Sequence, residues 1–241
     1  MSDGYEEDLA YVHHAGFERL ADHAATVLEE ELRRRGIRGG TIVDLCCGGG
    51  PVSRKLSDAG YDAFGVDISG AMIEMARERV PEGYFVQGPI RASELPPCVA
   101  VAAVGECFNY LFDEGNTEEG LRDLLRRIHA ALIRGGVLIF DAAGPGRAPP
   151  RSQTSAQGED WAVMASAEED EESRILTRRI TTFRKVGELY RRHEEVHRLR
   201  LMRPDAVFMQ LHDLGFGVRV LDGYGEMRFP PGLTGFLAQK P

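Results

Sequence analysis

The segment IVDLCCGGGP, residues 42–51, decides the fold, because a short apolar run is followed there by an acid and then by three glycines. The apolar run predicts a strand over residues 41–45 that is buried on both faces. Pro51 suits the first turn of a helix, which predicts a helix over residues 51–59. A glycine-rich turn between a strand and a helix leaves backbone N–H groups free to meet a ligand. The segment therefore predicts a ligand-binding turn in an α/β fold.

Predicted strands and helices alternate on both sides of this turn. Apolar residues recur every three or four positions over residues 5–35, which predicts a long helix before the turn. Ser69 is placed to cap a helix over residues 70–79. Further strands are predicted over residues 62–66, 84–87, 99–104 and 137–140, and a further helix over residues 117–133. This alternation predicts a parallel sheet with helices on both faces.

The pattern changes after Asp141. Residues 142–158 are rich in proline, glycine and serine and are predicted to form a loop. Three strands are predicted next, over residues 161–167, 174–184 and 189–201, followed by a helix over residues 205–214 and strands over residues 218–221 and 235–239. The last two of the three strands flank a hairpin connection. We expect an antiparallel insertion, and then a C-terminal part that returns to the core sheet.

Composition and charge argue against several classes of protein. The chain has 241 residues, 43% of them hydrophobic, which is enough for a packed core. Its formal net charge of −9 argues against nucleic acid as a partner, because phosphate binding requires a basic patch. The N-terminal segment is acidic and polar, unlike a signal peptide, and no apolar run is long enough to span a membrane. We expect a cytoplasmic protein.

The four cysteines are Cys46, Cys47, Cys98 and Cys107. They have no metal-ligand spacing and no histidine partner nearby. The adjacent pair Cys46 and Cys47 does not fit a normal disulfide framework. We therefore expect reduced thiols and no metal site.

The glycine turn and a second acid distinguish two classes of cofactor. Residues 48–53 read G-x-G-x-x-S, so the third glycine of the dinucleotide-binding pattern is missing. Asp67, about 20 residues beyond the turn, suits a ribose hydroxyl in either class. Asp44 stands directly before the turn, where a carboxylate repels a pyrophosphate and attracts a cation. The two acids favour S-adenosylmethionine, which is cationic and has no phosphate.

Together these features resemble the class I S-adenosylmethionine-dependent methyltransferases over nearly the whole chain. Residues 44–50 resemble the family motif D-x-G-x-G-x-G, with Cys46 in place of the first glycine. Residues 65–69 resemble the second motif, which implies that Asp67 holds the ribose and that the next residue lies against the adenine. Residues 134–141 resemble the turn and strand after the fourth motif.

The resemblance implies a Rossmann-like fold with a seven-stranded, mostly parallel sheet whose last strand runs antiparallel. In the third motif Pro89 stands where the family often has an acid that accepts a hydrogen bond from the adenine. A proline side chain cannot accept it, so we expect backbone groups near Ile90 to read the adenine. The residues expected at the cofactor are Tyr11, His13, Asp44, Cys46, Cys47, Gly48, Gly50, Asp67, Ile68, Met72, Pro89, Ile90 and Gly105.

Residues 11–17, 105–111 and 195–199 resemble a bacterial small-molecule methyltransferase subgroup. The resemblance implies an N-terminal helical lid over residues 1–40 and a cofactor-binding core over residues 41–141. Residues 142–203 then form the insertion, as a substrate lid or a dimer element, and residues 204–241 complete the core sheet. We expect a small-molecule methyl acceptor, no nucleic-acid or membrane partner, and a homodimer as the candidate assembly.

Methyl transfer from a sulfonium is an in-line displacement, so the protein mainly has to hold the acceptor about 3 Å from the methyl group and exclude water. A general base is needed only when the acceptor arrives protonated. Glu106 is a candidate base or amine-binding group, and Asn109 and Tyr110 are candidate acceptor contacts, because they follow a strand at the edge where open α/β sheets bind ligands. His197, which shares a strand face with His193, is a candidate base in the insertion.

Each of these candidates has a structural alternative. Glu106 also suits a surface carboxylate, Asn109 a local turn and Tyr110 a packed aromatic ring, and His197 also suits an exposed strand face. The helix with Tyr11 and His13 also suits simple packing, and Met72 also suits the core. Two other functions stay open: a non-catalytic protein that binds S-adenosylmethionine or a partner, and a nucleotide-cofactor oxidoreductase, which the missing third glycine disfavours.

Overall fold

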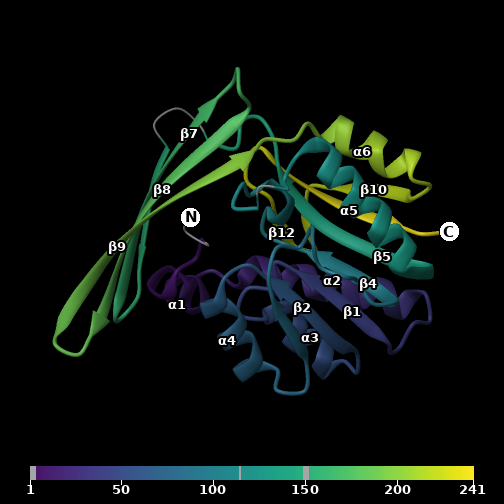
Figure 1. The fold of residues 1–241 in the computed structure, drawn as a ribbon, viewed down its shortest axis with the longest axis horizontal. Coiled ribbons are helices and arrows are strands. Elements are labelled where there is room, and N and C mark those ends of the chain that lie inside the picture. The colour runs from purple at the N-terminus through teal and green to yellow at the C-terminus, as the bar shows by residue number, and fades with distance from the viewer. Residues whose placement is uncertain (1–3, 114, 149–151) are drawn as a thin grey trace.

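The computed structural model describes residues 4–113, 115–148 and 152–241. Its centre is a seven-stranded sheet (Figure 1). The strands are β1 Thr41–Leu45, β2 Asp62–Asp67, β3 Tyr84–Gln87, β4 Cys98–Ala103, β5 Leu132–Ala143, β10 Gly217–Leu221 and β13 Leu233–Gln239. In space they follow the order β10-β13-β5-β4-β1-β2-β3. β13 runs antiparallel to β5 and β10, and the other neighbours pair in parallel, so the predicted mostly parallel sheet with an antiparallel last strand is confirmed.

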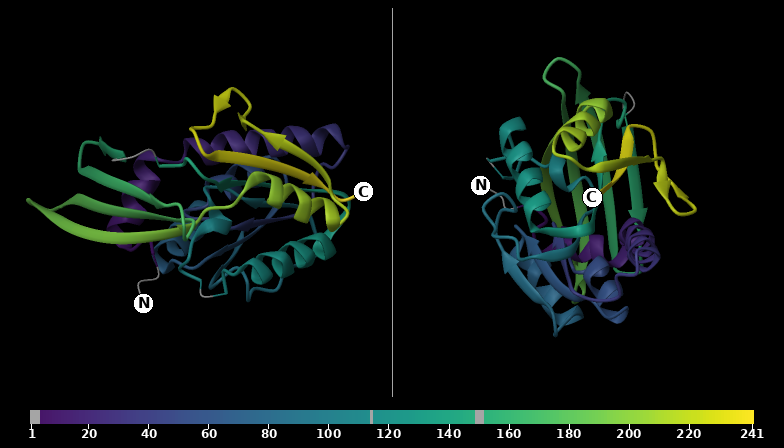
Figure 2. Two further views of the ribbon diagram at one scale, coloured as in Figure 1. Left: turned by 90° about the horizontal axis from the view of Figure 1, so that it is seen from above. Right: turned by 90° about the vertical axis from the view of Figure 1, so that its right-hand side faces the viewer.

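Helices cover both faces of this sheet (Figure 2). One face packs against α5 Glu118–Ala131 and α6 Pro204–Asp213. The other face packs against α2 Arg19–Arg34, α3 Pro51–Asp58 and α4 Gly70–Arg79. Because β1 and β4 lie in the middle of the sheet, their side chains are buried on both faces, which explains their continuous apolar sequences.

The single helix predicted over residues 5–35 is wrong, because the chain forms two helices there, α1 Glu7–Gly16 and α2. α2 packs on the core sheet, whereas α1 leaves the core and buries Val12 against Trp161 of the insertion. A Cβ on Gly16 would lie 2.7 Å from the Trp161 ring, so the glycine permits this close contact. Both helices bury an apolar face, which is why the apolar repeat continues across the break.

The insertion is a four-stranded antiparallel sheet that projects away from the core (Figures 1 and 2). Its strands are β6 Ser152–Gln157, β7 Trp161–Asp170, β8 Ile175–Val186 and β9 Leu189–Arg200. The prediction of an antiparallel insertion is confirmed for the last three strands. The loop predicted over residues 142–158 is wrong in part, because β6 pairs with β7 there. The polar sequence SQTSAQ hides this strand, since β6 lies at the edge of the sheet and its residues are mostly exposed.

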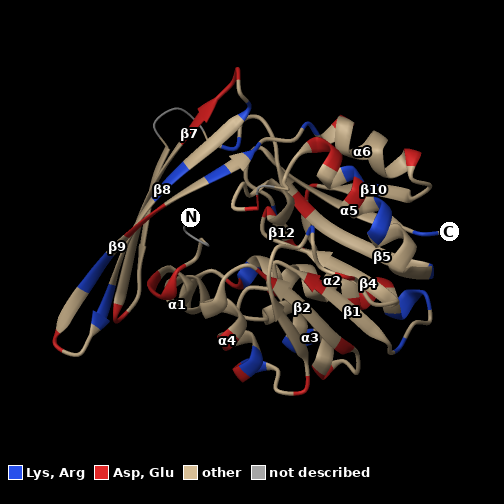
Figure 3. Cartoon of the chain, in the orientation of Figure 1, with Lys and Arg blue, Asp and Glu red and all other residues tan. Residues whose placement is uncertain are grey.

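Basic and acidic residues are interspersed along the core and the insertion sheet (Figure 3). Two arginines of the insertion pair with acids of α1. Arg184 lies 3.1 Å from Glu7, and Arg191 lies 2.5 Å from Asp8. These ion pairs and the Val12–Trp161 packing join α1 to the insertion. None of the helices formed by the described residues combines the length and the hydropathy that a membrane crossing requires.

Candidate functional site

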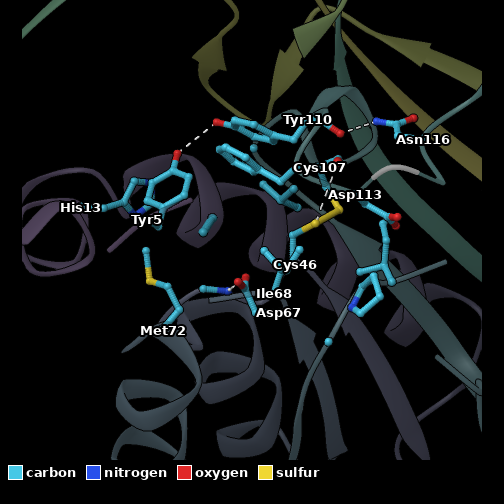
Figure 4. A pocket seen from close by; sticks show the side chains of 18 of the residues that line it. Tyr5, His13, Cys46, Asp67, Ile68, Met72, Cys107, Tyr110, Asp113 and Asn116 are labelled. Carbon is cyan, nitrogen blue, oxygen red and sulfur yellow. Dashed lines mark hydrogen bonds between the residues drawn. A yellow bond between two sulfur atoms is a disulfide. The ribbon is translucent and has the colours of Figure 1, made fainter. Parts of the chain in front are cut away.

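A cavity opens beside the glycine-rich turn, at the carboxyl ends of β1, β2 and β4 (Figure 4). We call it the cofactor cavity. Its wall consists of the loops that follow β1, β2, β3 and β4, together with the N-terminal segment and the start of α2. Nine of the predicted cofactor residues line it: His13, Cys46, Gly48, Asp67, Ile68, Met72, Pro89, Ile90 and Gly105.

Asp67 is held at the end of β2 by two backbone N–H groups. Gly48 N donates to Oδ2 at 2.9 Å, and Ser69 N donates to Oδ1 at 2.9 Å. Ser69 also caps α4 as predicted, because its Oγ accepts a hydrogen bond from Met72 N at 3.2 Å. Each carboxylate oxygen of Asp67 has further acceptor capacity. The residue lines the cavity and is placed to accept hydrogen bonds from ribose hydroxyls.

The cysteine expectation is wrong for one pair, because Cys46 and Cys107 form a disulfide across 61 residues of sequence. Both line the cofactor cavity, whereas Cys47 and Cys98 are free and buried. The fold creates this pair by placing the loops after β1 and β4, which are neighbouring strands, side by side. Cys46 has a φ of 53°, the left-handed conformation that normally selects glycine. This backbone conformation fits the family's glycine at that position.

Four predicted cofactor residues are not part of the cavity wall: Tyr11, Asp44, Cys47 and Gly50. The Tyr11 hydroxyl instead donates to Asp160 Oδ2 at 2.5 Å, and the Arg184 guanidinium lies 4.0 Å from its ring centre. Tyr11 therefore faces the insertion and not the cofactor cavity. The residue that takes its predicted place is Tyr5, which lines the cavity. Sequence periodicity gave no signal for Tyr5, because it precedes the first turn of α1.

Asp44 is buried next to the glycine turn, with 2% of its surface exposed. Its Oδ2 accepts a hydrogen bond from Ser53 Oγ at 2.7 Å. Burial raises the pKa of Asp44 from 3.8 to about 7, against the lowering effect of Ser53. The expectation that Asp44 directly faces a cationic ligand is therefore not met in this structure. Its carboxylate instead binds Ser53 in the first turn of α3, directly after the glycine turn.

The buried Asp44 carboxylate predicts a pH dependence of stability. A carboxyl whose pKa is raised by folding contributes stability at low pH and loses it as the pH rises through the folded pKa, here about 7. Between pH 5 and pH 8 the wild type should lose about 2–3 kcal/mol more unfolding free energy than Asp44→Asn. Denaturant titration without cofactor measures this difference. Asp62→Asn, at an exposed position on β2, should show the same pH dependence as the wild type. If the unfolding free energies of wild type and Asp44→Asn differ by the same amount at pH 5 and pH 8, the raised pKa of Asp44 is contradicted.

Pro89 and Ile90, which are expected at the adenine, line this cavity, and Pro89 stands where the family's third motif has an acid. Besides Asp67, the described residues bring one other carboxylate to this wall, that of Asp113. Asp113 precedes α5, and its Oδ1 accepts a hydrogen bond from Gly115 N at 2.8 Å. Asn116 lines the same wall and receives a hydrogen bond from Arg91 at 2.5 Å. No motif in the sequence pointed to these residues.

A second cavity of about 540 Å³ adjoins the first, and we call it the acceptor cavity. Its wall is built by α1, the loop after β4, the loop after β5 and the inner face of β6, β7 and β8. Six residues line both cavities: Tyr5, His13, Phe17, Leu20, Gly105 and Tyr110. The Tyr5 and Tyr110 hydroxyls lie 3.0 Å apart at this junction. Figure 4 marks this hydrogen bond with a dashed line. Burial lowers the pKa of His13 to about 4, so its imidazole is neutral at pH 7.

The loop that carries Gly105 and Glu106 is shaped by the buried Asp141. Gly105 N and Glu106 N donate to its carboxylate at 3.0 and 2.7 Å, and the Tyr224 hydroxyl donates at 3.0 Å. Both loop residues have left-handed backbones, with φ of 85° and 62°. Burial raises the pKa of Asp141 to about 6. This carboxylate therefore fixes the backbone of Gly105, which lines both cavities, and of Glu106, which lines the acceptor cavity.

Glu106 lines the acceptor cavity and is 5% exposed. Arg147 Nε lies 2.6 Å from Oε1, and Arg178 donates to both oxygens at 2.5 and 2.9 Å. Burial acts to raise the pKa of Glu106, but the two arginines hold it below its ordinary value. The carboxylate is therefore ionised and paired, which makes it a poor general base. Sequence inspection missed both arginines, because neither stands in a motif.

Asn109 and His197 line neither cavity. Asn109 is fully buried, and its side chain bonds the backbone of Ala143 and Arg200. His197 is 1% exposed, and its Nε2 lies 2.8 Å from Glu195 Oε2. Its ring packs against the rings of Tyr5, Tyr110 and Phe112. These positions favour a supporting part for Asn109 and His197 over direct contact with an acceptor.

Comparison with known proteins agrees with this architecture. Residues 42–136 match the family model of a methyltransferase domain. The structure of an S-adenosylmethionine-dependent methyltransferase from Clostridium acetobutylicum has a TM-score of 0.80, covers 96% of this chain and 97% of its own, and is 16% identical. This likeness shows the shared fold.

Two relatives are similar over part of the chain. A trans-aconitate 2-methyltransferase of Paracidovorax citrulli is 33% identical over 52% of this chain and 47% of its own length. An 18S rRNA (guanine-N(7))-methyltransferase of Bos taurus is 28% identical over 41% of this chain and 37% of its own.

The residues that line the cofactor cavity suit S-adenosylmethionine in kind, because Asp67 offers a carboxylate for a ribose, Ile68 and Met72 offer apolar surface, and the glycine turn brings backbone close to the cavity. The described residues contain no group of three or more His, Cys, Asp or Glu side chains placed to hold a metal ion. The chain therefore contains a methyltransferase domain over residues 42–136, and its strand order and this cavity agree with the class I fold of S-adenosylmethionine-dependent methyltransferases.

Proposed function

We propose that this enzyme transfers a methyl group from S-adenosylmethionine to a small molecule held in the acceptor cavity. The observation that carries the proposal is the shared wall of the two cavities at Tyr5, Gly105 and Tyr110. A cofactor in one cavity and an acceptor in the other would meet at this junction. The acceptor cavity of about 540 Å³ lies within the range of small-molecule sites, about 300–1,000 Å³.

A small acceptor is also favoured by enclosure and charge. The N-terminal helix, the core loops and the insertion sheet surround the acceptor cavity on several sides. The net charge of −9 disfavours a polynucleotide, whose backbone needs basic side chains. The relative that acts on trans-aconitate agrees with a small acceptor, and the relative that acts on 18S rRNA makes RNA the alternative to be tested.

We propose that the N-terminal segment acts as a lid over the junction. The carbonyl of Tyr5 accepts a hydrogen bond from Ser69 Oγ at 2.7 Å, at the cofactor loop. The backbone N–H groups of Tyr5 and Glu6 donate to Glu195 of β9 at 2.8 and 3.0 Å. The segment thus bridges the cofactor loop and the insertion. The cofactor cavity, at about 140 Å³, is below the usual range for ligand sites, which supports opening of this lid before the cofactor enters.

When bound, S-adenosylmethionine supplies a methyl group that is already activated. The residues of this chain then have to align the acceptor and exclude water. Tyr5 and Tyr110 are placed to orient it at the junction, and His197 supports their rings from behind. Neutral His13 is the titratable group at the junction that can accept a proton there, with weak basicity. The proposed mechanism is therefore mainly one of positioning.

Transfer of label from methyl-labelled S-adenosylmethionine tests this proposal. The enzyme is offered a dialysable extract of small metabolites and, separately, total RNA. We expect label in the small-metabolite fraction, reduced about tenfold or more in Tyr5→Ala because the acceptor loses its alignment. Tyr84→Ala, at an exposed position on β3, is the matched control and should retain wild-type activity. Label in RNA would overturn the small-molecule proposal, and cofactor binding without transfer to either pool would favour a non-catalytic protein.

A further inference from the structure

The acceptor cavity has a positive charge inside an acidic protein. The described residues in its wall include three arginines, Arg19, Arg147 and Arg178, and one carboxylate, Glu106. The wall also includes the imidazole of His13, whose lowered pKa keeps it neutral at pH 7. The chain as a whole has a formal charge of −9, so this local excess of cations is opposite in sign to the net charge of the chain.

Glu106 accepts hydrogen bonds from only some of the N–H donors of Arg147 and Arg178. Arg178 uses two terminal nitrogens on it, but Arg147 uses only Nε, at 2.6 Å. Among the described residues, the two terminal nitrogens of Arg147 have no hydrogen-bond acceptor in the protein. Since a guanidinium is always charged and has five N–H donors, Arg147 keeps several donors directed at no protein group.

The backbone on both sides of Arg147 is fixed by one carboxylate. Gly146 N donates to Glu169 Oε2 at 3.0 Å, and Ala148 N donates to Glu169 Oε1. Glu169 belongs to β7 of the insertion. The loop that carries Arg147 is therefore tied to the wall of the acceptor cavity. Arg178, from β8, is 18% exposed and held by Glu106, so both guanidinium groups are positioned before any ligand arrives.

We propose that the methyl acceptor carries an oxyanion, a carboxylate or a phosphate ester, that binds to Arg147 beside the Arg178–Glu106 pair. A guanidinium recognises such groups through paired N–H donors, which fix both the position and the orientation of the ligand. Most of the remaining wall is apolar, with Val163, Leu176 and Leu233 as examples, so the rest of the acceptor is expected to be largely apolar. This inference rests on the proposed small-molecule methyl transfer and adds the substrate class.

Calorimetric titration of the enzyme saturated with S-adenosylhomocysteine tests the inference without knowledge of the acceptor. The probes are succinate, inorganic phosphate and the neutral analogue succinamide. We expect at least one anion to bind the wild type, and to bind Arg147→Gln about tenfold more weakly or worse, because charge-assisted hydrogen bonds are lost. Arg147→Lys should recover part of the affinity. Arg203→Gln removes the same charge from an exposed arginine outside the cavity and should bind as the wild type.

The outcomes distinguish a carboxylate acceptor from a phosphate ester, and they test this inference separately from the proposed function. Tighter binding of succinate points to a carboxylate acceptor, and tighter binding of phosphate points to a phosphate ester. Binding of neither anion, equal binding to Arg147→Gln, or equal binding of succinamide would overturn the inference. Label transfer to RNA would count against the proposed function even if an anion binds here. A neutral small molecule methylated as fast by Arg147→Gln as by the wild type would count against this inference alone.

Discussion

Asp67→Ala should weaken S-adenosylmethionine binding by about 100-fold or more. The Asp67 carboxylate lines the cofactor cavity and is fixed by Gly48 N and Ser69 N. Two hydrogen bonds from ribose hydroxyls to an ionised carboxylate contribute about 1.5–3 kcal/mol each, so losing both accounts for this factor. Calorimetry with S-adenosylmethionine and S-adenosylhomocysteine measures the affinity of each variant.

The control separates the cofactor contact from a loss of folding. Asp62→Ala removes the same side chain from the opposite, exposed end of β2 and should bind the cofactor as the wild type does. Asp67→Asn keeps one carbonyl acceptor, so its cofactor affinity should lie between those of Asp67→Ala and the wild type. Its circular dichroism spectrum should be like that of the wild type. Wild-type affinity in a folded Asp67→Ala protein would show that the ribose is held elsewhere.

Asn109→Leu should lower the unfolding free energy by about 3–5 kcal/mol. Its Nδ2 donates to Ala143 O at 2.8 Å and to Arg200 O at 2.6 Å, and its Oδ1 accepts from Ala143 N at 3.0 Å. The substitution leaves Ala143 N and Arg200 O without this buried partner, at about 1–3 kcal/mol each, whereas Ala143 O keeps its hydrogen bond from Met202 N. The melting temperature should fall by roughly 6–20 °C, since each kcal/mol shifts it by about 2–4 °C in a chain of this size.

This experiment also decides between two roles for Asn109. A residue that contacts the acceptor would lose activity on substitution with little change in stability, whereas a residue that joins the loop after β4 to β5 and β9 loses stability first. Thermal and denaturant unfolding measure the effect. Gln153→Leu, at an exposed position on β6, is the control for adding an apolar side chain and should leave the melting temperature unchanged. A stable, inactive Asn109→Leu would return the residue to the active site.

The cofactor half of the site was predictable from local sequence. Asp67, Gly48 and Ile68 belong to short segments that directly follow apolar strands. In a parallel sheet the carboxyl ends of such strands meet at one edge, so each loop after a strand contributes to the same site. Even where a family residue was replaced, as by Cys46, the left-handed φ of 53° keeps the backbone of the turn.

The acceptor half was not predictable in the same way. Tyr5, Arg147 and Arg178 come from the N-terminal segment, a loop and the insertion, and each is an ordinary polar residue in its local sequence. The buried polar residues Asn109 and His197 looked like candidates for chemistry because sequence shows residue type and not contacts. Likewise, the 61 residues between Cys46 and Cys107 conceal their pairing, which depends on two adjacent strands.

The sequence by itself determined the alternating α/β core, the glycine turn and the acid Asp67 at the edge of the cofactor cavity, because these depend on periodicity and on residues close in the chain. Only the tertiary structure decided where α1 turns away from α2, that residues 152–157 form a strand, and which side chains line the acceptor cavity. The path of α1 and the acceptor cavity depend on contacts between distant segments, such as Tyr5 with Glu195 across 190 residues and Glu106 with Arg178 across 72 residues. The strand over residues 152–157 depends on its pairing with β7. Which polar side chains become buried, and which partners they then meet, is settled only when the chain folds.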